Sequence, residues 1–373
     1  MKRNMLNSLI LAALATPGMA MAANAPTLGE VLDASGVSIN GYLDVAYSHL
    51  SGTGAFTPSG TANRVFDTEP NSFSLHQAAI TLAKQPKEGY GGLVNLTMGR
   101  DARIIKSYDQ GTSDFDVTQA YVQNVMGPVT VIAGKFVTSA GAEVINSTSN
   151  SNYSRSILFG YAIPFTHTGL RATYALNDQL SFTGGLSNGW DQAKDANKQK
   201  TVELGASFMP SKMFMLMAMV HSGKEPVDII NAPNGVGGQR NLIDVVATIN
   251  AINNLTFVVN VDQASQKDDG TGMKSKWGGA AVYANYQISD KYSASLRTEY
   301  FNDKDGYRTG VGVGTGGQKW KEVTLTGSYM PTASVQLRAE VRADKSDKLA
   351  FVGSGGNAKK SQNSMGLQAI YKF

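Results

Sequence analysis

The stretch Val335-Gln336-Leu337-Arg338-Ala339-Glu340-Val341-Arg342-Ala343 decides the fold class. Apolar residues occupy every second position, and Gln, Arg, Glu and Arg stand between them. Successive side chains of a β-strand point to opposite faces, so this segment predicts a strand with one apolar and one polar face. The same two-residue period recurs at 255–263, 292–300, 323–329 and 363–373, which predicts an all-β protein from about residue 37 onward.

The connections between these segments fall into two alternating length classes. Seven are short and rich in Pro, Gly, Asn and Asp, which supply the backbone angles of tight turns. They lie at 85–89, 126–128, 177–178, 209–211, 253–254, 289–290 and 330–332. Eight are long and polar, at 51–70, 101–114, 138–164, 189–199, 223–238, 266–273, 302–318 and 345–359. Sixteen strands joined in this way are typical of a closed antiparallel transmembrane β-barrel with short periplasmic turns and long extracellular loops.

Aromatic residues stand near many predicted strand ends, where a bilayer barrel carries its aromatic girdles. The residues expected in these girdles are Tyr47, Phe136, Tyr174, Tyr286, Tyr300, Trp320, Tyr329, Tyr371 and Phe373. Beyond the N-terminus the longest apolar run, 214–220, is far shorter than the roughly 20 residues that a membrane helix needs. A soluble β-sandwich or propeller is the alternative fold, but a sandwich rarely sorts its connections so regularly by length.

The N-terminus has the three parts of a secretory signal peptide. Lys2 and Arg3 are basic, residues 9–15 are apolar, and Ala20-Met21-Ala22 fits the small-x-small cleavage rule. The segment before the barrel could form a helical turn or two, or a tail in the pore. The expected divisions are a signal peptide at 1–22, a periplasmic segment at 23–36 and a barrel at 37–373.

Composition excludes several kinds of site. The chain has no cysteine, which rules out disulfides, thiolate metal sites and cysteine nucleophiles. Its histidines, His49, His76, His167 and His221, lack the paired spacing typical of zinc sites. Loss of the two basic signal-peptide residues changes the formal net charge from +4 to +2, which predicts no nucleic-acid binding. We expect no catalytic residue, no cofactor and no metal site.

The polar strand faces are expected to line the lumen, because a barrel of this size encloses water and turns its apolar face to lipid. The charged residues assigned to the pore lining are Asp44, Lys135, Arg171, Asp244, Asp262, Arg297, Glu299, Glu322, Arg338, Glu340 and Arg342. Acids and bases are nearly balanced in this set, which argues against a strongly charged filter. Any one of these charges could instead lie on a solvated face and select nothing.

Several segments resemble a known family. Residues 154–169 (SRSILFGYAIPFTHTG) look like the core of β-barrel porins of the OmpL-like type, and so do 71–78 (NSFSLHQA) and 91–93 (GGL). The resemblance is strongest over 37–190, whereas 223–373 match only in general barrel character. It implies a water-filled channel for passive diffusion of small polar solutes and ions, without a settled substrate, and it contributes no catalytic residues.

The third long connection, 138–164, is the longest, and analogy with general porins suggests that it folds into the barrel as a constriction. The residues that it would offer there are Glu143, Asn146, Asn150, Asn152, Tyr153 and Arg155. A carboxylate facing a guanidinium across a narrow opening would orient dipolar solutes.

Two other functions remain open. The first is a closed structural or adhesive barrel whose loops bind a partner. The second, less favoured, is an outer-membrane enzyme, for which the sequence has no G-x-S-x-G elbow and no assembled triad. Expected partners are outer-membrane lipid, lipopolysaccharide, small polar solutes and the barrel-assembly machinery, which would recognise the aromatic Phe373. Analogy with general porins suggests a homotrimer.

Overall fold

A computed structural model describes residues 27–55, 64–67, 69–107, 111, 113–226, 237–311, 314, 316–353 and 355–373. The expected signal peptide at 1–22 lies outside these residues. The chain divides into two units, 1–37 and 38–373, and the second unit is the barrel. In the first unit, helix α1 (Leu28–Ser35) begins with a capping box between Thr27 and Glu30 and ends at Gly36, whose φ of 66° suits glycine.

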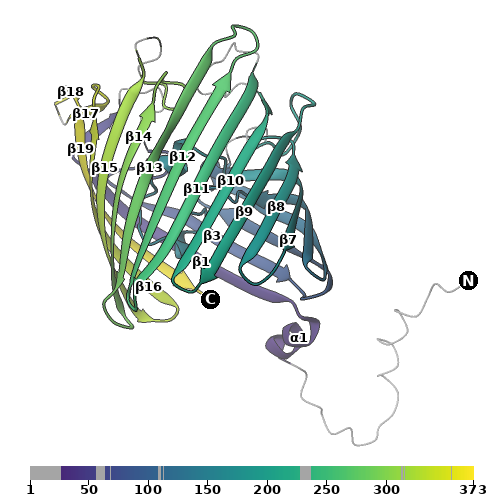
Figure 1. Ribbon diagram of the computed structural model, residues 1–373. Helices are drawn as coiled ribbons and strands as arrows, with labels where there is room; N and C mark the ends of the chain where they lie inside the picture. Colours follow the sequence, from purple (N-terminus) through teal and green to yellow (C-terminus); the bar gives the residue numbers. More distant parts are fainter. Residues whose placement is uncertain are drawn as a thin grey trace, which may run out of the picture. The chain divides into compact units, whose positions relative to one another are not determined.

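The second unit is a closed barrel of sixteen antiparallel strands, which confirms the fold expected from the sequence (Figure 1). The barrel strands are β1 (Ser38–Leu50), β3 (Ser72–Lys84), β4 (Gly89–Met98), β5 (Phe115–Met126), β6 (Val129–Val137), β7 (Thr166–Ala175), β8 (Leu180–Ser187), β9 (Thr201–Ser211), β10 (Phe214–Glu225), β11 (Gly238–Ile252), β12 (Leu255–Lys267), β13 (Lys274–Gln287), β14 (Tyr292–Asp303), β15 (Gln318–Thr332), β16 (Val335–Ser346) and β19 (Ser361–Lys372). Among the described residues, no helix combines the length and hydropathy needed to cross a membrane.

The barrel closes where the first and last strands pair. β1 runs antiparallel to β19, and the backbone groups of Gly41 and Phe373 exchange two hydrogen bonds of 2.9 Å. Short turns gather at this end of the barrel and long connections at the other (Figure 1). Because closure leaves no sheet edge, each strand satisfies its backbone groups on a neighbouring strand, as a hydrocarbon environment requires.

Two short turns lie slightly further along the chain than the sequence suggested. β9 runs through Pro210 before turning, and β15 runs through Pro331. Each proline coincides with a shift in strand register next to the turn. Proline cannot donate to a strand ladder, but a bulge leaves a residue unpaired, so these strands continue past their prolines.

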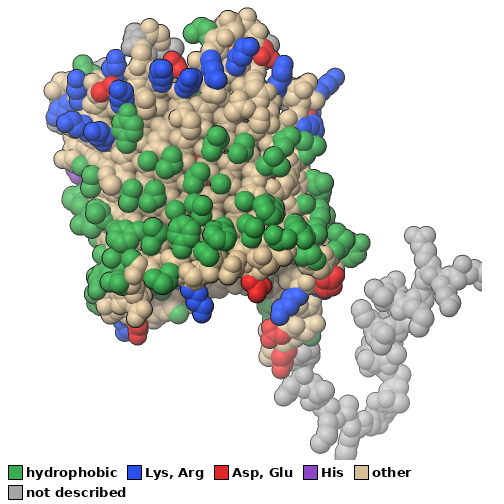
Figure 2. Space-filling view, viewed as in Figure 1, with side chains coloured by type: hydrophobic (Ala, Val, Ile, Leu, Met, Phe, Trp, Pro, Cys, Tyr) green, Lys and Arg blue, Asp and Glu red, His purple; other side chains and the backbone are tan. Residues whose placement is uncertain are grey.

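The barrel wall reverses the arrangement of a soluble protein. On β16, Leu337 and Val341 are exposed on the outside, whereas Arg338, Glu340 and Arg342 are buried inside. Figure 2 shows apolar side chains gathered in a belt around the visible wall, with most Lys and Arg beyond the belt at the end with the long connections. An apolar belt of this kind matches the hydrocarbon of a bilayer.

The aromatic girdle was predicted wrongly at two positions. Phe136 and Trp320 are each 1% exposed and lie inside the barrel. Phe136 lies under the guanidinium of Arg171, with 4.3 Å between the Arg171 Cζ and the ring centroid, and Trp320 belongs to the main apolar cluster. Both stand near strand ends where connections fold inward and cover the inner face, so an aromatic residue there need not face lipid.

Short elements occur in the long connections. α2 (Ala102–Ile105) lies between β4 and β5, and a small sheet joins β2 (Gly52–Ala55), β17 (Phe351–Gly353) and β18 (Ala358–Lys359). The connection between β6 and β7 contains the 3-10 turn η2 (Ser147–Ser149) and the helix α3 (Ile157–Tyr161). This connection, residues 138–165, is called the inner loop below.

Candidate functional site in the barrel lumen

The inner loop lies within the barrel, where its backbone is hydrogen-bonded to charged side chains of the wall. Glu299 of β14 accepts from the N–H groups of Ile157 at 2.7 Å and Leu158 at 3.1 Å. Glu340 of β16 accepts from those of Tyr153 at 2.7 Å and Ser154 at 3.1 Å. These hydrogen bonds satisfy N–H groups that would otherwise be buried without partners.

Wall arginines satisfy the loop carbonyls in the same way. Arg338 donates to the carbonyl of Asn150 at 2.5 Å, and Arg342 donates to that of Arg155 at 2.7 Å. Arg297 donates to the carbonyl of Ser154 at 2.6 Å. The alternating charges of β14 and β16 therefore hold the loop main chain, and they do not stand free in open water.

Arg297 is the centre of a buried ion network. Its guanidinium pairs with Glu143 of the inner loop at 2.7 Å and with Glu322 of β15 at 2.7 Å, and its side chain is 0% exposed. Arg342 lies 3.6 Å from the same Glu322 and pairs with Asp344 at 2.7 Å. A buried guanidinium with several carboxylate partners is compensated, whereas removal of one partner would leave a charge without a counter-ion.

Apolar packing holds the other side of the loop. Leu158, Phe159 and Ile163 are buried in one cluster with Trp277 of β13 and Phe301 of β14. The indole of Trp277 also donates to the carbonyl of Ala162 at 3.2 Å. The loop is therefore fixed both by charge-assisted hydrogen bonds and by side-chain burial.

A chain of polar contacts anchors the loop to β3. Tyr153 contacts Nε2 of His76 through its hydroxyl at 3.2 Å, and Nδ1 of His76 contacts Asp101 at 3.2 Å. The ring of Tyr153 also lies against Gly366 of β19, where an added Cβ would approach Cδ1 to 2.4 Å. Gln77 of β3 donates to the carbonyl of Ile145 at 2.9 Å.

The remaining residues assigned to the pore lining make polar contacts with neighbouring strands, and Gln368 links Asp44 to Arg338 of the loop network. Asp44 accepts from Gln368 at 2.8 Å, Lys135 pairs with Asp116 at 2.9 Å, and Arg171 pairs with Glu203 at 2.6 Å. Asp244 and Asp262 are buried neighbours in register across β11 and β12. Of the six residues expected at the constriction, Asn146 is exposed, and the buried ones are Glu143, Asn150, Asn152, Tyr153 and Arg155.

A cavity of about 130 Å³ remains between the inner loop and one side of the wall. Its lining is mostly uncharged, and the residues are Tyr42, Thr81, Asn95, Thr118, Gln119, Val137, Thr138, Glu143, Val144, Ile145, Asn146, Phe159 and Phe165. Glu143 is the one ionisable acid or base among them apart from the phenol of Tyr42, and its carboxylate is bound to Arg297 and to the N–H of Ser156 at 2.8 Å.

Sequence reasoning missed several residues that shape the lumen. Gln77, Trp277 and Gly366 contact the loop, but nothing local in the sequence marks them. It also missed the proximity of His167 and His221, whose ring centroids are 5.1 Å apart. Hairpin counting could have placed His221 opposite Glu203, since both lie nine residues from residue 212 in the turn between β9 and β10.

The closed barrel, its lipid-facing belt and its infolded loop define an outer-membrane β-barrel of the porin class. The chain belongs to the family described as "Putative beta-barrel porin-2, OmpL-like", which matches residues 36–373. The match therefore extends the resemblance through 223–373, where the sequence motifs alone showed only general barrel character. No curated protein sequence gives a significant match.

Solved outer-membrane structures are similar in fold. OprB of Pseudomonas putida aligns at TM-score 0.63 and 12% identity, covering 92% of this chain and 96% of that one. The anion-selective porin from Comamonas acidovorans aligns at 0.62 and 10%, covering 90% and 99%. OmpT of Vibrio cholerae, in a trimer form, aligns at 0.61 and 14%, covering 90% and 99%. Identities this low show the fold alone.

Proposed function

We propose that this porin passes small, uncharged polar solutes by diffusion through the space between the inner loop and strands β1 and β3–β6. Beside apolar side chains, the cavity there has hydroxyl and amide groups, from Thr81, Asn95, Thr118 and Gln119 on the wall and Asn146 on the loop. Such groups exchange hydrogen bonds with a hydrated solute without fixing its charge. The observation that supports this route is that charged side chains on the opposite side of the wall are hydrogen-bonded to the backbone of the inner loop.

Weak ion selectivity follows from the same arrangement. Arg297 and Arg342 form buried ion pairs with carboxylates. Glu299 and Glu340 are bound by backbone N–H groups of the loop, so all four charges are engaged before an ion enters. The field in the remaining passage is therefore weak, because paired charges largely cancel at a distance. The Comamonas acidovorans porin is described as anion-selective, but among the described residues no unpaired cationic side chain lines the cavity.

Two measurements on the purified, refolded chain test this proposal. Planar-bilayer recordings in a KCl gradient should give a reversal potential close to zero. Liposome swelling should be faster with small neutral sugars than with amino acids of net charge. A strongly cation- or anion-selective current would contradict the uncharged route, and swelling no faster than in protein-free liposomes would favour the closed structural barrel.

We also propose that the lumen has no catalytic role. His76 is bound between Tyr153 and Asp101, and Nδ1 of His167 contacts the carbonyl of Gly189 at 3.2 Å. Ser154, a serine in the inner loop, has its hydroxyl 3.1 Å from Arg297 Nη2 instead of next to a histidine. A nucleophile needs a base within hydrogen-bond reach, and neither histidine offers that to Ser154. Hydrolysis of ester or peptide probes by the refolded chain would contradict this view.

The proposal also covers the membrane contacts, export and oligomeric state of the protein. The apolar belt would contact lipid, and the Lys and Arg at the long-connection end would bind lipopolysaccharide phosphates (Figure 2). Export would use residues 1–22 as a cleaved signal peptide, with 23–36 left in the periplasm. The trimer form of Vibrio cholerae OmpT supports a homotrimer here. Mass spectrometry of the chain extracted from outer membranes, native and then denatured, would reveal a monomer or an uncleaved N-terminus if these proposals are wrong.

A further inference from the structure

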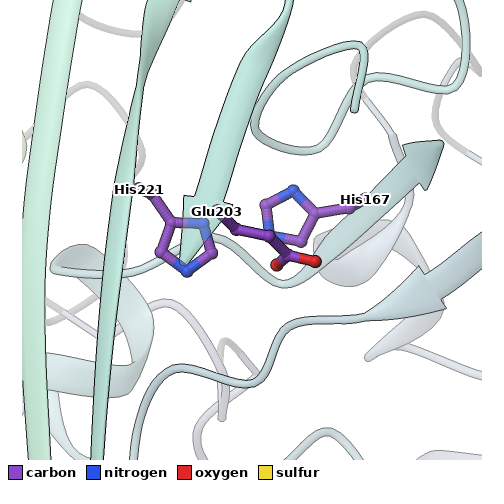
Figure 3. A group of neighbouring side chains, drawn as sticks. All are labelled: His167, Glu203 and His221. Atoms are coloured by element: carbon purple, nitrogen blue, oxygen red, sulfur yellow. The ribbon is translucent and has the colours of Figure 1, made fainter. Parts of the chain in front are cut away.

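Three buried side chains from three strands meet on the inner wall, outside the inner-loop network. They are His167 of β7, Glu203 of β9 and His221 of β10, and Figure 3 shows them close together. One potential ligand atom from each lies within 4.8 Å of the other two. The two imidazole rings are almost parallel, at an interplanar angle of 9°. Two imidazoles and one carboxylate form a ligand set that binds first-row transition metals.

The hydrogen bonds of the two histidines leave ring nitrogens available to a metal ion. A carbonyl oxygen can only accept, so Nδ1 of His167 must donate to Gly189, which leaves the lone pair on Nε2. Metal-bound histidines are commonly fixed by this kind of backbone hydrogen bond. Among the residues that the structure describes, Nε2 of His167 and both ring nitrogens of His221 have no hydrogen-bond partner. His167 is 1% and His221 0% exposed, so these atoms are buried, polar and unsatisfied.

Strand register brings the carboxylate to the histidines. Arg171, Gly185, Glu203 and His221 lie in one row across β7, β8, β9 and β10. An added Cβ at Gly185 would lie 2.3 Å from Oε1 of Glu203, so glycine at this position leaves the space that Glu203 occupies over β8. Glu203 pairs with Arg171 through both oxygens, at 2.6 and 2.9 Å. Each carboxylate oxygen has two lone pairs, so one remains available for a metal.

We propose that His167, Glu203 and His221 form a binding site for a divalent transition-metal ion such as Zn²⁺, held by Nε2 of His167, a ring nitrogen of His221 and a carboxylate oxygen of Glu203. Tetrahedral coordination at about 2.1 Å places ligand atoms about 3.4 Å apart, so the side chains must close by roughly an ångström or more. The bound ion would link β7 to β9 and β10. Trp190 lies in the connection between β8 and β9, and its ring centroid is 6.5 Å from that of His221.

Arg171 supplies a sharp test, because its positive charge opposes a cation and its guanidinium holds Glu203. Arg171→Gln should therefore tighten Zn²⁺ binding, whereas a merely structural cluster would show no such gain. His167→Ala and His221→Ala should each weaken binding by at least about tenfold, since each removes a ligand. His49→Ala is the matched control, because His49 is exposed and bonded to Asn71.

The experiment uses the refolded full-length chain in detergent, stripped with EDTA and titrated with Zn²⁺ by calorimetry. We expect one ion per chain and a rise in the unfolding temperature with Zn²⁺ that is lost in His221→Ala but kept in His49→Ala. Co²⁺ added to the unmutated chain should give the intense visible absorption of tetrahedral coordination, which needs no variant to fold. Any of three results would overturn the proposal: no Zn²⁺ bound, no Co²⁺ absorption band, or equal Zn²⁺ affinity in His221→Ala and the unmutated chain.

Discussion

Nη1 of Arg297 on β14 donates to Oε1 of Glu143 at 2.7 Å, and this ion pair joins the barrel wall to the inner loop. The two residues are 154 positions apart in the sequence, and both are buried. Removal of the guanidinium would leave Glu143 without its ion-pair partner and Glu322 with only the more distant Arg342, at 3.6 Å. A charge predicted to face the pore water therefore positions the inner loop.

Replacement of Arg297 should be strongly destabilising. Arg297→Met removes the ion-pair partner of the buried Glu143 and the nearer of the two partners of Glu322, and we expect a loss of about 3–5 kcal/mol in the free energy of unfolding. Glu143→Gln in the same background should recover part of the loss, because residues in direct contact couple by about 0.5–3 kcal/mol. The free energies of unfolding of the intact chain, the two single variants and the double variant form a double-mutant cycle. They can be measured by urea unfolding in lipid vesicles, followed by tryptophan fluorescence. Additive effects of the two substitutions would show that the pair does not couple.

Deletion of residues 143–157 should increase single-channel conductance, because it removes the part of the inner loop that fills the lumen. It also exposes Glu340 and Arg342 to pore water, so the current should become sensitive to the charge of the permeating ion. Deletion of 269–272, an exposed tip between β12 and β13, is the control and should leave conductance unchanged. Equal conductance of the 143–157 deletion and the intact chain would mean that the loop does not obstruct the pore.

The close contact between Gly366 and Tyr153 makes Gly366→Ala a test of loop packing. A Cβ at this position would lie 2.4 Å from the Tyr153 ring, so the ring and its backbone must move at a cost of about 1–3 kcal/mol. Gly327→Ala is the control because it is the same substitution, and an added Cβ at Gly327 would have no atom within 4 Å. A folded barrel migrates faster than the unfolded chain on gel electrophoresis. The temperature at which heating converts the folded band to the unfolded band should fall for Gly366→Ala only. Tyr153→Leu should remove most of the difference.

The lipid-facing belt predicts that the cost of an introduced arginine in unfolding free energy depends strongly on its position. Val341 is 51% exposed in the middle of β16, beside Leu325 and Met365 on the outer face. Val341→Arg should cost about 2–4 kcal/mol in a bilayer, because the guanidinium would lie in hydrocarbon. Leu349→Arg changes a residue of similar exposure, 55%, in an outer connection and should cost little. Equal unfolding free energies for the two variants in vesicles would argue that β16 does not face lipid.

Regular alternation made much of the barrel predictable from sequence. The polar and apolar positions of 335–343 require one wet and one lipid-facing side, and the alternating connection lengths imply the strand number. Local composition also located the turns, except where Pro210 and Pro331 sit in bulges next to them. These features depend on neighbours a few residues apart, so a single sequence contains them.

The lumen was less predictable, because its contacts join distant parts of the chain. Strand alternation assigned Glu299 and Glu340 to the pore lining, but it could not show that their partners are loop N–H groups. Phe136 and Trp320 were misplaced for the same reason, since the elements that cover them are remote in sequence.

The sequence by itself determined a cylinder with an apolar outside and a polar inside, because a strand's side chains alternate and a bilayer admits only closed sheets. Only the tertiary structure decided how that polar inside is used. Closure and strand register place the inner loop against Arg297, and they bring His167 to His221 across three strand boundaries. The physical reason is that hydrogen bonds and ion pairs form between neighbours in space, and barrel closure makes neighbours of residues that the chain separates.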